Sequence, residues 1–481
     1  MDIQLLIAGK DVAATGGATF ERRNPITGQV ASVAAAATVA DANAACDAAA
    51  AAFPKWSSMG PSARRAVLNK AADALEARTP EFVALMADEI GATAGWAGFN
   101  CFLAAGMLRE AAAMTTQVSG EVIPSDKPGC ISMALRTPAG VVLGIAPWNA
   151  PVILGVRAIA VPLAVGNTVV LKASEICPGV QRLIGRVLQD AGLPEGAINV
   201  VTNSPETAPQ IVEALIAHPA VKRVNFTGST KVGKIIGELS GRHLKPAILE
   251  LGGKAPMVVL DDANIEDAVN GAAFGAFMNQ GQICMSTERL VVDEKIADDF
   301  VTRFAAKASR LPAGDPRGGN VVLGSLVSVA AAEKVEHLIQ DAVAKGAKLV
   351  AGGRREGSIM DACVLDHVKS DMEIYYEESF GPVVSVIRAS GDDALVAIAN
   401  DTDYGLASAV YSQDINRAMS VAQRIQAGIC HINAATVADE AQMPFGGVKG
   451  SGYGRFGGRY GVAEFTDVKW LTIEREPHYP F

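Results

Sequence analysis

Cys284 is the side chain in this sequence that is best suited to act as a nucleophile. It ends the segment Asn279-Gln-Gly-Gln-Ile-Cys284, a glycine-containing turn that follows a predicted helix. A cysteine in such a turn can be reached by a substrate, and its thiolate is a strong nucleophile. The alternative is a buried, inert thiol, which is the more frequent role of an isolated cysteine. The turn makes Cys284 a candidate and leaves both interpretations open.

Two polar residues at the ends of predicted strands could assist this nucleophile. Glu250 follows an apolar run, where a carboxylate is costly to bury unless it acts as a base or pairs with a cation such as Lys254. Asn149 follows the strand predicted at 141–146, and its amide could donate to a developing oxyanion. The alternative for Asn149 is a turn-forming role beside a proline.

A turn of small residues suits a phosphate group. The segment Phe226-Thr-Gly-Ser-Thr-Lys-Val-Gly233 joins a predicted strand to a predicted helix. Backbone N–H groups at the start of a helix bind anions, although the spacing of Gly228 and Gly233 is not that of GxGxxG. This motif is a weak signal when taken alone.

Composition describes the kind of protein that must position these residues. A chain of 481 residues is too long for one hydrophobic core, so two or more domains are expected. Its 49% hydrophobic and 19% charged residues are typical of a large enzyme. The net charge of −9, with scattered Lys and Arg, argues against a nucleic-acid-binding surface.

Membrane insertion and secretion are not expected from the sequence. The apolar stretches near 141–171 are interrupted by Pro, Asn and Arg, and the start of the chain lacks a signal-peptide pattern. The seven cysteines are widely spaced and form no CxxC pair or Cys/His cluster, so neither a disulfide framework nor a metal site is predicted. We therefore expect a reduced, cytoplasmic protein.

The pattern of elements predicts an α/β protein with a Rossmann-type parallel sheet. Alanine-rich, mostly helical sequence fills the first 120 residues. Strands are then predicted at 141–146, 168–172, 198–202, 221–226 and 247–251, with helices at 152–165, 178–191, 207–217 and 231–239 between them. A second α/β series begins near 257–260, with helices at 265–279, 295–309, 330–345 and 415–425 and strands at 289–292 and 381–387. Ligands bind such sheets beyond the carboxyl ends of the strands.

Seven motifs occur in order along the chain and together resemble the aldehyde dehydrogenase superfamily. They are PWN at 147–149, KASE at 172–175, FTGST at 226–230, ELGGK at 250–254, GQxC at 281–284, EESFGPV at 377–383 and PFGGxKxSGxG at 444–454. The resemblance spans essentially the whole chain. It implies an NAD-binding domain (1–120 and 141–251), an α/β catalytic domain (252–450) and a small β oligomerisation domain (121–140 and 464–481) that makes a homodimer or homotetramer.

The resemblance also implies a mechanism and assigns roles to single residues. Cys284 would attack the aldehyde to form a thiohemiacetal, with Asn149 and the Cys284 backbone N–H holding the oxyanion. An acyl thioester would follow, and Glu250 would activate the water that hydrolyses it, with no metal. Relatives that pass the acyl group to coenzyme A generally lack this carboxylate. The residues expected to bind the cofactor NAD are Trp148, Lys172, Glu175, Gly228, Ser229, Val232, Leu251, Glu378 and Phe380.

Substrate choice is expected to depend on the helix that follows the PWN motif. Ala150, Leu154 and Arg157 share one of its faces, where the small Ala150 leaves room for a flat ring and Arg157 offers donors. The alternative for Arg157 is an ion pair that never touches substrate. The predicted lining is Ala150, Ile153, Leu154, Arg157, Met278, Ile283, Met285 and Phe445, with Trp96, Phe99 and Leu103 as further candidates.

Within the superfamily, the run 147–175 looks most like the bacterial salicylaldehyde dehydrogenases of naphthalene breakdown. It implies oxidation of an aromatic aldehyde, with salicylaldehyde to salicylate as the first expectation. Vanillin, benzaldehyde or a broad range of aldehydes are the alternatives.

Overall fold

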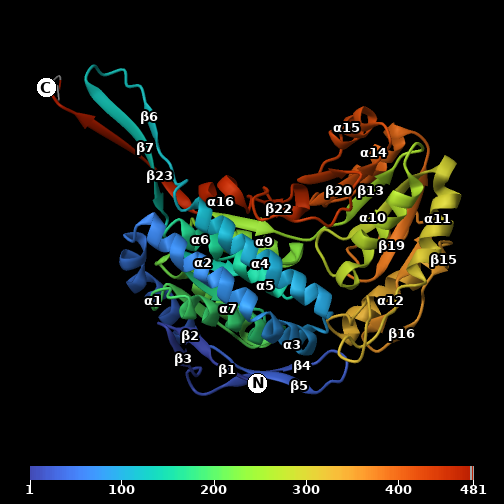
Figure 1. Cartoon of the computed structure of the whole chain (residues 1–481), viewed down its shortest axis with the longest axis horizontal. Helices are drawn as coiled ribbons and strands as arrows, with labels where there is room; N and C mark the ends of the chain where they lie inside the picture. Colours follow the sequence, from blue (N-terminus) through green and yellow to red (C-terminus); the bar gives the residue numbers. More distant parts are fainter. Residues whose placement is uncertain (477–478, 480) are drawn as a thin grey trace.

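The computed structural model describes residues 1–476, 479 and 481, which form two α/β lobes and a slender β arm (Figure 1). An eight-stranded sheet is the centre of the first lobe and a seven-stranded sheet is the centre of the second. The predicted architecture of two α/β units and a small β sheet is therefore confirmed.

The first sheet is a parallel sheet with short antiparallel strands at both edges. Its order is β22-β12-β11-β8-β9-β10-β2-β3. The parallel strands are β8 (Val141–Ile145), β9 (Thr168–Lys172), β10 (Ile198–Val201), β11 (Val221–Thr227) and β12 (Ala247–Glu250). The edge strands are β2 (Leu5–Ile7), β3 (Lys10–Val12) and β22 (Gly452–Tyr453). All five parallel strands agree with their predicted ranges to within one residue at each end.

The order of these strands creates the place where a ligand can bind. The chain runs from β8 outward to β9 and β10, and then returns to the other side of β8 with β11 and β12. Successive β8 side chains pack into different hydrophobic clusters, Val142 in one and Leu143 in the other, because helices cover both faces of the sheet. The carboxyl ends of β8 and β11 therefore form a topological switch point.

Helices surround this sheet. They are α1 (Val39–Ser57), α2 (Pro61–Ala77), α3 (Thr79–Ile90), α4 (Ala94–Met114), α5 (Pro151–Arg157), α6 (Ala160–Ala164), α7 (Pro178–Asp190), α8 (Ala208–Ala217) and α9 (Thr230–Arg242). Among the described residues, no helix has the length and apolar character needed to cross a bilayer.

The single helix predicted at 152–165 is wrong, because the chain breaks between α5 and α6. Pro162 has no N–H to donate to the carbonyl of Ala158 four residues earlier. That carbonyl instead accepts a hydrogen bond of 3.1 Å from the Asn225 side chain in β11. The break therefore ties this segment to the sheet.

The prediction for the first 120 residues missed five strands. Besides β2 and β3, the strands β1 (Asp2–Ile3), β4 (Thr19–Arg23) and β5 (Val30–Ala35) form a small separate sheet. They are short, and β5 has the sequence VASVAA, whose alanines favour a helix when local propensity alone is considered.

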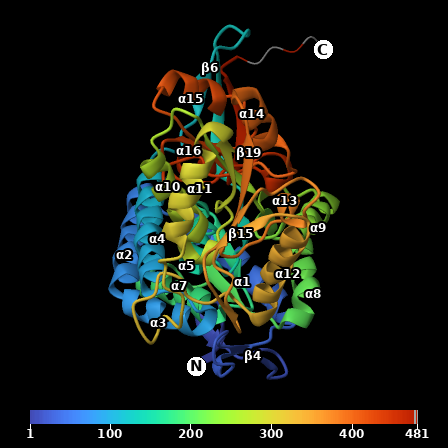
Figure 2. The same ribbon diagram turned by 90° about the vertical axis from the view of Figure 1, so that its right-hand side faces the viewer.

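The second sheet has the order β15-β18-β19-β14-β13-β20-β21. Its strands are β13 (Ala255–Val259), β14 (Thr287–Asp293), β15 (Lys348–Ala351), β18 (Cys363–Asp366), β19 (Val383–Ala389), β20 (Ala407–Tyr411) and β21 (Ile429–Ile432). Its helices are α10 (Ile265–Phe277), α11 (Glu294–Ala308), α12 (Val329–Ala344), α13 (Glu373–Tyr376), α14 (Asp392–Asn400) and α15 (Ile415–Ala422). The last helix, α16 (Gly458–Glu464), packs against α4 and α6 of the first lobe. In Figure 2, α11 and α12 flank β15.

The elements predicted for this second series are confirmed in order and type, but the prediction omitted the strands β15, β18, β20 and β21 and the helices α13 and α14. The strand predicted at 381–387 lies two residues later, because Gly381 and Pro382 belong to the preceding turn. The helix predicted at 265–279 ends at Phe277, and a 3₁₀ segment (Met278–Gly281) follows it.

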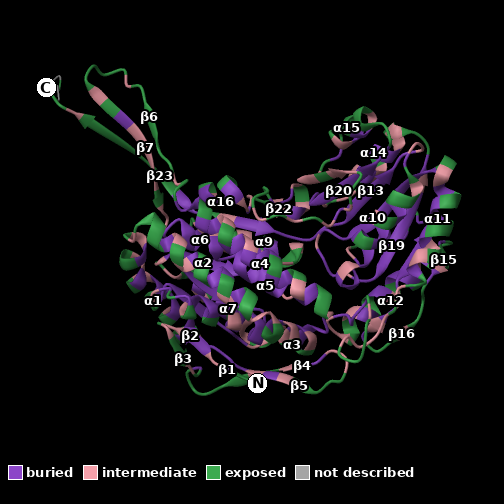
Figure 3. Cartoon of the chain, in the orientation of Figure 1, coloured by how far each residue is buried: buried purple, intermediate pink, exposed green. Residues whose placement is uncertain are grey.

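A three-stranded antiparallel sheet projects from the first lobe as the arm. It consists of β6 (Glu121–Ile123), β7 (Cys130–Pro138) and β23 (Thr466–Glu474), in the order β23-β7-β6. Figure 3 shows that much of the arm is exposed, and Trp470 in β23 is 78% exposed. The strands β6 and β7 lie within the predicted segment 121–140 and β23 lies within 464–481, of which residues 477, 478 and 480 are outside the described residues.

Candidate active site

The predicted catalytic residues come together from three elements at the switch point. Asn149 follows β8, Glu250 ends β12, and Cys284 follows the 3₁₀ segment after α10. All three line one cavity of about 270 Å³. Cys284 also lines a second cavity of about 180 Å³. The thiol therefore belongs to the walls of both cavities.

The loop that carries Cys284 has an uncommon backbone. Asn279, Gln280 and Gly281 have φ values of 49°, 56° and 71°, so three successive residues are left-handed. Such conformations cost energy for residues other than glycine and are often found at functional sites. A methyl group on Gly281 would collide with the carbonyl of Gly381, and one on Gly253 would collide with the carbonyl of Cys284. These glycines allow the backbones to approach closely.

Side-chain amides hold Asn149 beside this loop. The Asn149 Nδ2 donates to the carbonyl of Gln282 at 3.1 Å. The Asn149 carbonyl accepts from Asn279 Nδ2 at 3.0 Å and from Trp96 Nε1 at 3.0 Å. The amide of Asn149 is thereby fixed next to the nucleophile loop, as a preorganised oxyanion donor requires.

Residues 325–327 hold the loop from its other side, and the sequence analysis missed them. Gln280 Nε2 donates to the carbonyl of Ser325 at 3.0 Å, and Gln282 Oε1 accepts from the backbone N–H of Val327 at 2.9 Å. The Val327 carbonyl accepts from Arg22 Nη2 at 3.0 Å. No local pattern marks this strap (residues 325–327), because its function depends on contacts with distant parts of the chain.

Glu250 is buried and forms no ion pair with any described residue. It is 1% exposed, and within the described part of the chain neither of its carboxylate oxygens has a hydrogen-bond partner. Burial raises the pKa of Glu250 to about 7, and the positive charge of Arg157 opposes this shift. Burial, and next the negative charge of Glu250, raise the pKa of the Cys284 thiol well above its usual value. The resting thiol is therefore protonated and needs a base.

Lys254, the cation considered as a partner for Glu250, pairs instead with Glu288. Both side chains of this ion pair are buried. Glu288 also accepts hydrogen bonds from the backbone N–H groups of Ser379 at 2.9 Å and Phe380 at 3.2 Å. Phe380 has a φ of 50° and lies edge-on to Trp148, with ring centroids 5.7 Å apart. The Lys254–Glu288 pair thus leaves Glu250 free and positions the EESFGPV turn.

The 270 Å³ cavity contains six of the residues expected to bind the cofactor. They are Trp148, Gly228, Ser229, Leu251, Glu378 and Phe380. Ser229 caps α9 by accepting from the N–H of Val232, and Glu378 Oε1 accepts from the N–H of Gly253 at 2.9 Å. Pro147, Thr227 and Gly252 also line the cavity and were missed.

Lys172, Glu175 and Val232 are not part of this lining. Lys172 Nζ and Glu175 Oε2 form an ion pair of 3.0 Å just beyond β9, and Val232 is half-exposed in the first turn of α9. A methyl group on Gly252 would lie 2.9 Å from Glu378 Oε2, so this glycine keeps one side of the cavity open. A dinucleotide fits these features, because the start of α9 offers N–H groups to phosphates and two aromatic rings line the same cavity.

All eight residues predicted to contact substrate line the 180 Å³ cavity. Trp96, Phe99 and Leu103 line it as well. Phe274, Val437, Ala438 and Asp439 complete the wall and were missed. Residues 437–439 lie in an irregular segment after β21, where neither helical nor strand periodicity marks a role.

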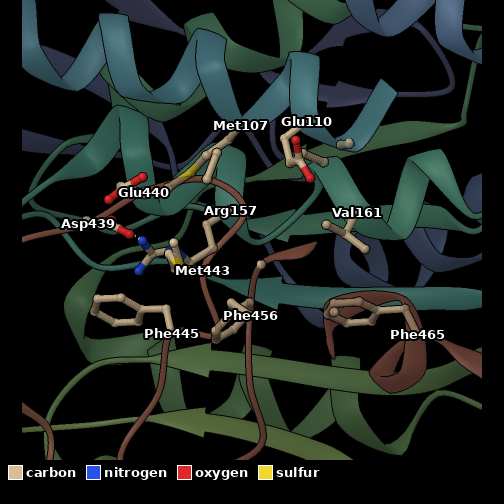
Figure 4. A pocket seen from close by; sticks show the side chains of 15 residues that line it. Met107, Glu110, Arg157, Val161, Asp439, Glu440, Met443, Phe445, Phe456 and Phe465 are labelled. Atoms are coloured by element: carbon tan, nitrogen blue, oxygen red, sulfur yellow. Dashed lines mark hydrogen bonds and ion pairs between the residues drawn. The ribbon is translucent and has the colours of Figure 1, made fainter. Parts of the chain in front are cut away.

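Arg157 makes the ion pair that was considered as the alternative to substrate contact. Its guanidinium pairs with Asp439, and both side chains are buried. The guanidinium also lies over the Phe445 ring, 4.1 Å from the ring centroid. Figure 4 shows these three residues beside an adjoining cavity of about 20 Å³. Arg157 still lines the larger cavity, so the ion pair forms part of the substrate wall.

Comparison with known proteins agrees with this arrangement. The chain matches the aldehyde dehydrogenase family model over residues 12–471. It belongs to the aldehyde dehydrogenase family.

Its relatives include enzymes of aromatic metabolism. A vanillin dehydrogenase from Pseudomonas fluorescens is 62% identical over 481 residues, which is 100% of both chains. The structure of a salicylaldehyde dehydrogenase from Pseudomonas putida G7 complexed with salicylaldehyde matches with a TM-score of 0.98, at 52% identity and 100% coverage of both chains. PnpE from Pseudomonas sp. WBC-3, in complex with nicotinamide adenine dinucleotide, matches with a TM-score of 0.95 at 37% identity, covering 100% of this chain and 99% of that chain.

Proposed function

We propose that this enzyme oxidises an aromatic aldehyde to its carboxylic acid with NAD, through a thioester on Cys284. The observation that carries the proposal is the place of Cys284 between two cavities, one with features that suit a dinucleotide and one with apolar walls. A cavity of about 150 Å³ with apolar walls can hold benzene, so 180 Å³ is sufficient for one substituted ring.

The chain's own residues supply the acid–base chemistry. The Cys284 thiol gives its proton to Glu250 while Sγ forms a bond to the aldehyde carbon. The oxyanion is held by the Asn149 amide and the Cys284 backbone N–H. When bound, NAD supplies the acceptor for the hydride that leaves this carbon. Glu250 releases its proton and takes another from water, whose oxygen attacks the thioester. The carbon–sulfur bond breaks, and the sulfur is protonated again.

The preference for NAD over NADP rests on Glu175. A carboxylate accepts a hydrogen bond from a free ribose hydroxyl and repels a 2′-phosphate. Its ion pair with Lys172 holds it at the end of β9, where the adenosine end of a dinucleotide is expected. The NAD-bound relative supports this choice. In the Glu175→Gln variant, the ratio of kcat/KM with NAD to kcat/KM with NADP should fall. An unchanged ratio would contradict the proposed role of Glu175 in the preference for NAD.

Salicylaldehyde is the first substrate to test, and vanillin is the alternative favoured by the 62% identical relative. Mixing the enzyme with NAD and each aldehyde should give NADH and free acid without coenzyme A. The Cys284→Ala variant should give neither product. If the wild type forms no NADH with salicylaldehyde, vanillin or benzaldehyde, the proposal is wrong.

Arg157 and Asp439 offer a test of how substituents are recognised. They are a charged pair in an otherwise apolar wall, so a ring hydroxyl group can find hydrogen-bond partners there. The Arg157→Ala variant should lose more kcat/KM with salicylaldehyde than with benzaldehyde. Equal losses would show that the pair only shapes the wall.

We further propose the domain limits given by the resemblance, a cytoplasmic location and a homo-oligomer bridged by the arm. Trp470 and Val468 on β23 are exposed apolar side chains, which supports contact with a second subunit. Every cysteine within the described residues is a free thiol, which supports a reducing compartment. Deletion of 466–481, which removes β23 from the arm, should change the mass found by light scattering. An unchanged mass would argue against bridging by the arm.

A further inference from the structure

The outer end of the substrate cavity is lined by aromatic rings that the oxidation of a single-ring aldehyde does not require. Phe99 in α4 is 38% exposed and Phe274 in α10 is 49% exposed, although both line the same cavity as Cys284. Asn149 and Glu250, next to the nucleophile, are buried. The two phenyl rings therefore mark the mouth of the cavity, and Figure 1 places their helices in different lobes.

The aromatic wall is continuous from the catalytic loop to this mouth. Trp96 Nε1 donates to the Asn149 carbonyl, which anchors the indole near the oxyanion donor. The Phe99 ring stacks on Trp96, with centroids 5.7 Å apart and planes inclined by 27°. On the other wall, Phe274 lies four residues before Met278, which also lines the cavity. A long, flat substrate would thus meet aromatic or thioether groups along its whole length.

The volume and the charges indicate what could bind at the mouth. The space of about 180 Å³ is enough for one substituted ring with its aldehyde carbon at Cys284. Apart from Cys284 and the mutually neutralising Arg157–Asp439 pair, the lining side chains are apolar. A group that extends beyond the first ring would therefore reach Phe99 and Phe274, and an uncharged aromatic ring suits them best.

We propose that Phe99 and Phe274 form a second aromatic subsite, which binds the distal ring of aldehydes whose two rings are joined by a short linker. This inference rests on the proposed function, because the first ring must be oxidised at Cys284. The mouth of the cavity would then select substrates, and a bulky substituent on the first ring, opposite the aldehyde group, should be accepted rather than excluded.

Two substrates that differ only in the second ring provide the test. They are 4-benzyloxybenzaldehyde and 4-methoxybenzaldehyde, which share the para ether. The measurement is kcat/KM with NAD for the wild type and for Phe99→Ala and Phe274→Ala. Loss of one aromatic contact should lower the value for the benzyloxy substrate by about threefold to tenfold. The value for the methoxy substrate should fall by a clearly smaller factor.

Phe102 provides a matched control, because it is a 70% exposed phenylalanine on α4 outside the cavity lining. Phe102→Ala should leave both substrates unchanged. Equal losses for both substrates in the Phe99 and Phe274 variants would overturn the subsite, as would a wild type that oxidises only the methoxy compound. If the wild type oxidises neither compound, nor any single-ring aldehyde, the proposed function itself fails.

Discussion

The ionisation of Glu250 should control the hydrolysis of the acyl-enzyme. Only the carboxylate can take a proton from water, and burial raises the pKa of Glu250 to about 7. The ionised fraction of a group with that pKa is about 9% at pH 6 and about 91% at pH 8. The rate constant of deacylation should therefore rise roughly tenfold between these two values. An ordinary glutamate would be ionised at both and would give a flat profile.

The assay must isolate deacylation from the earlier steps. An activated aryl ester can acylate Cys284 without cofactor, and the decay of the acyl-enzyme is then followed in single-turnover experiments from pH 5.5 to 9. Glu250→Gln should lower the rate constant by about 10²–10⁴-fold and should abolish the rise near pH 7.

A second carboxyl group requires a control. Burial also raises the pKa of Glu378 to about 7, so it would titrate over the same range. Glu378→Gln should keep the rise near pH 7, because the expected role of this side chain is to bind the cofactor and not to activate water. If the rise survives in Glu250→Gln and disappears in Glu378→Gln, Glu250 is not the base and the assignment above is wrong.

Three further variants test the energetics of the site. Since the pKa of Glu250 is higher in the folded than in the unfolded protein, its ionisation lowers the free energy of unfolding as the pH rises from about 4.5 to about 7, by up to about 3 kcal/mol. Glu250→Gln should therefore raise Tm at pH 8 and not at pH 4, and a lower Tm at pH 8 would contradict this destabilisation. Gln282→Leu removes the side-chain oxygen that accepts from Val327 in the strap, and so loosens the loop that orients Asn149. It should lower kcat by about tenfold or more with little change in KM. An unchanged kcat would show that the strap does not position the site. Lys254→Met leaves Glu288 buried without its cation and should cost about 3–5 kcal/mol in chemical denaturation, and the double replacement of Lys254 and Glu288 by apolar residues should recover part of this loss if the pair is the cause.

The central sheet and the catalytic residues could be predicted because their signals are local. A parallel strand buried on both faces is a short apolar run, so β8 to β12 are visible in the sequence. Glu250 and Asn149 each follow such a run, Cys284 follows a predicted helix, and all three lie within motifs of an enzyme family.

The strands near the N-terminus and the outer strands of the second sheet were harder to predict. β5 contains three alanines, and its strand conformation depends on pairing with β1 and β4. The end of α10 was also placed too late. The left-handed turn at Asn279 and Gln280 is maintained by contacts with Asn149 and Ser325, and residue types alone do not reveal it.

The sequence by itself determined which side chains could carry the chemistry and in which order they follow the strands. Only the tertiary structure decided which charges meet. Lys254 lies four residues after Glu250 but pairs with Glu288, and Arg157 pairs with Asp439, 282 positions away. The physical reason is that the energy of an ion pair depends on the distance between the two charges and on their burial. Separation along the chain determines neither of these. Among the described residues, those two pairings leave Glu250 without an ion-pair partner and place two opposite charges in the wall of the 180 Å³ cavity.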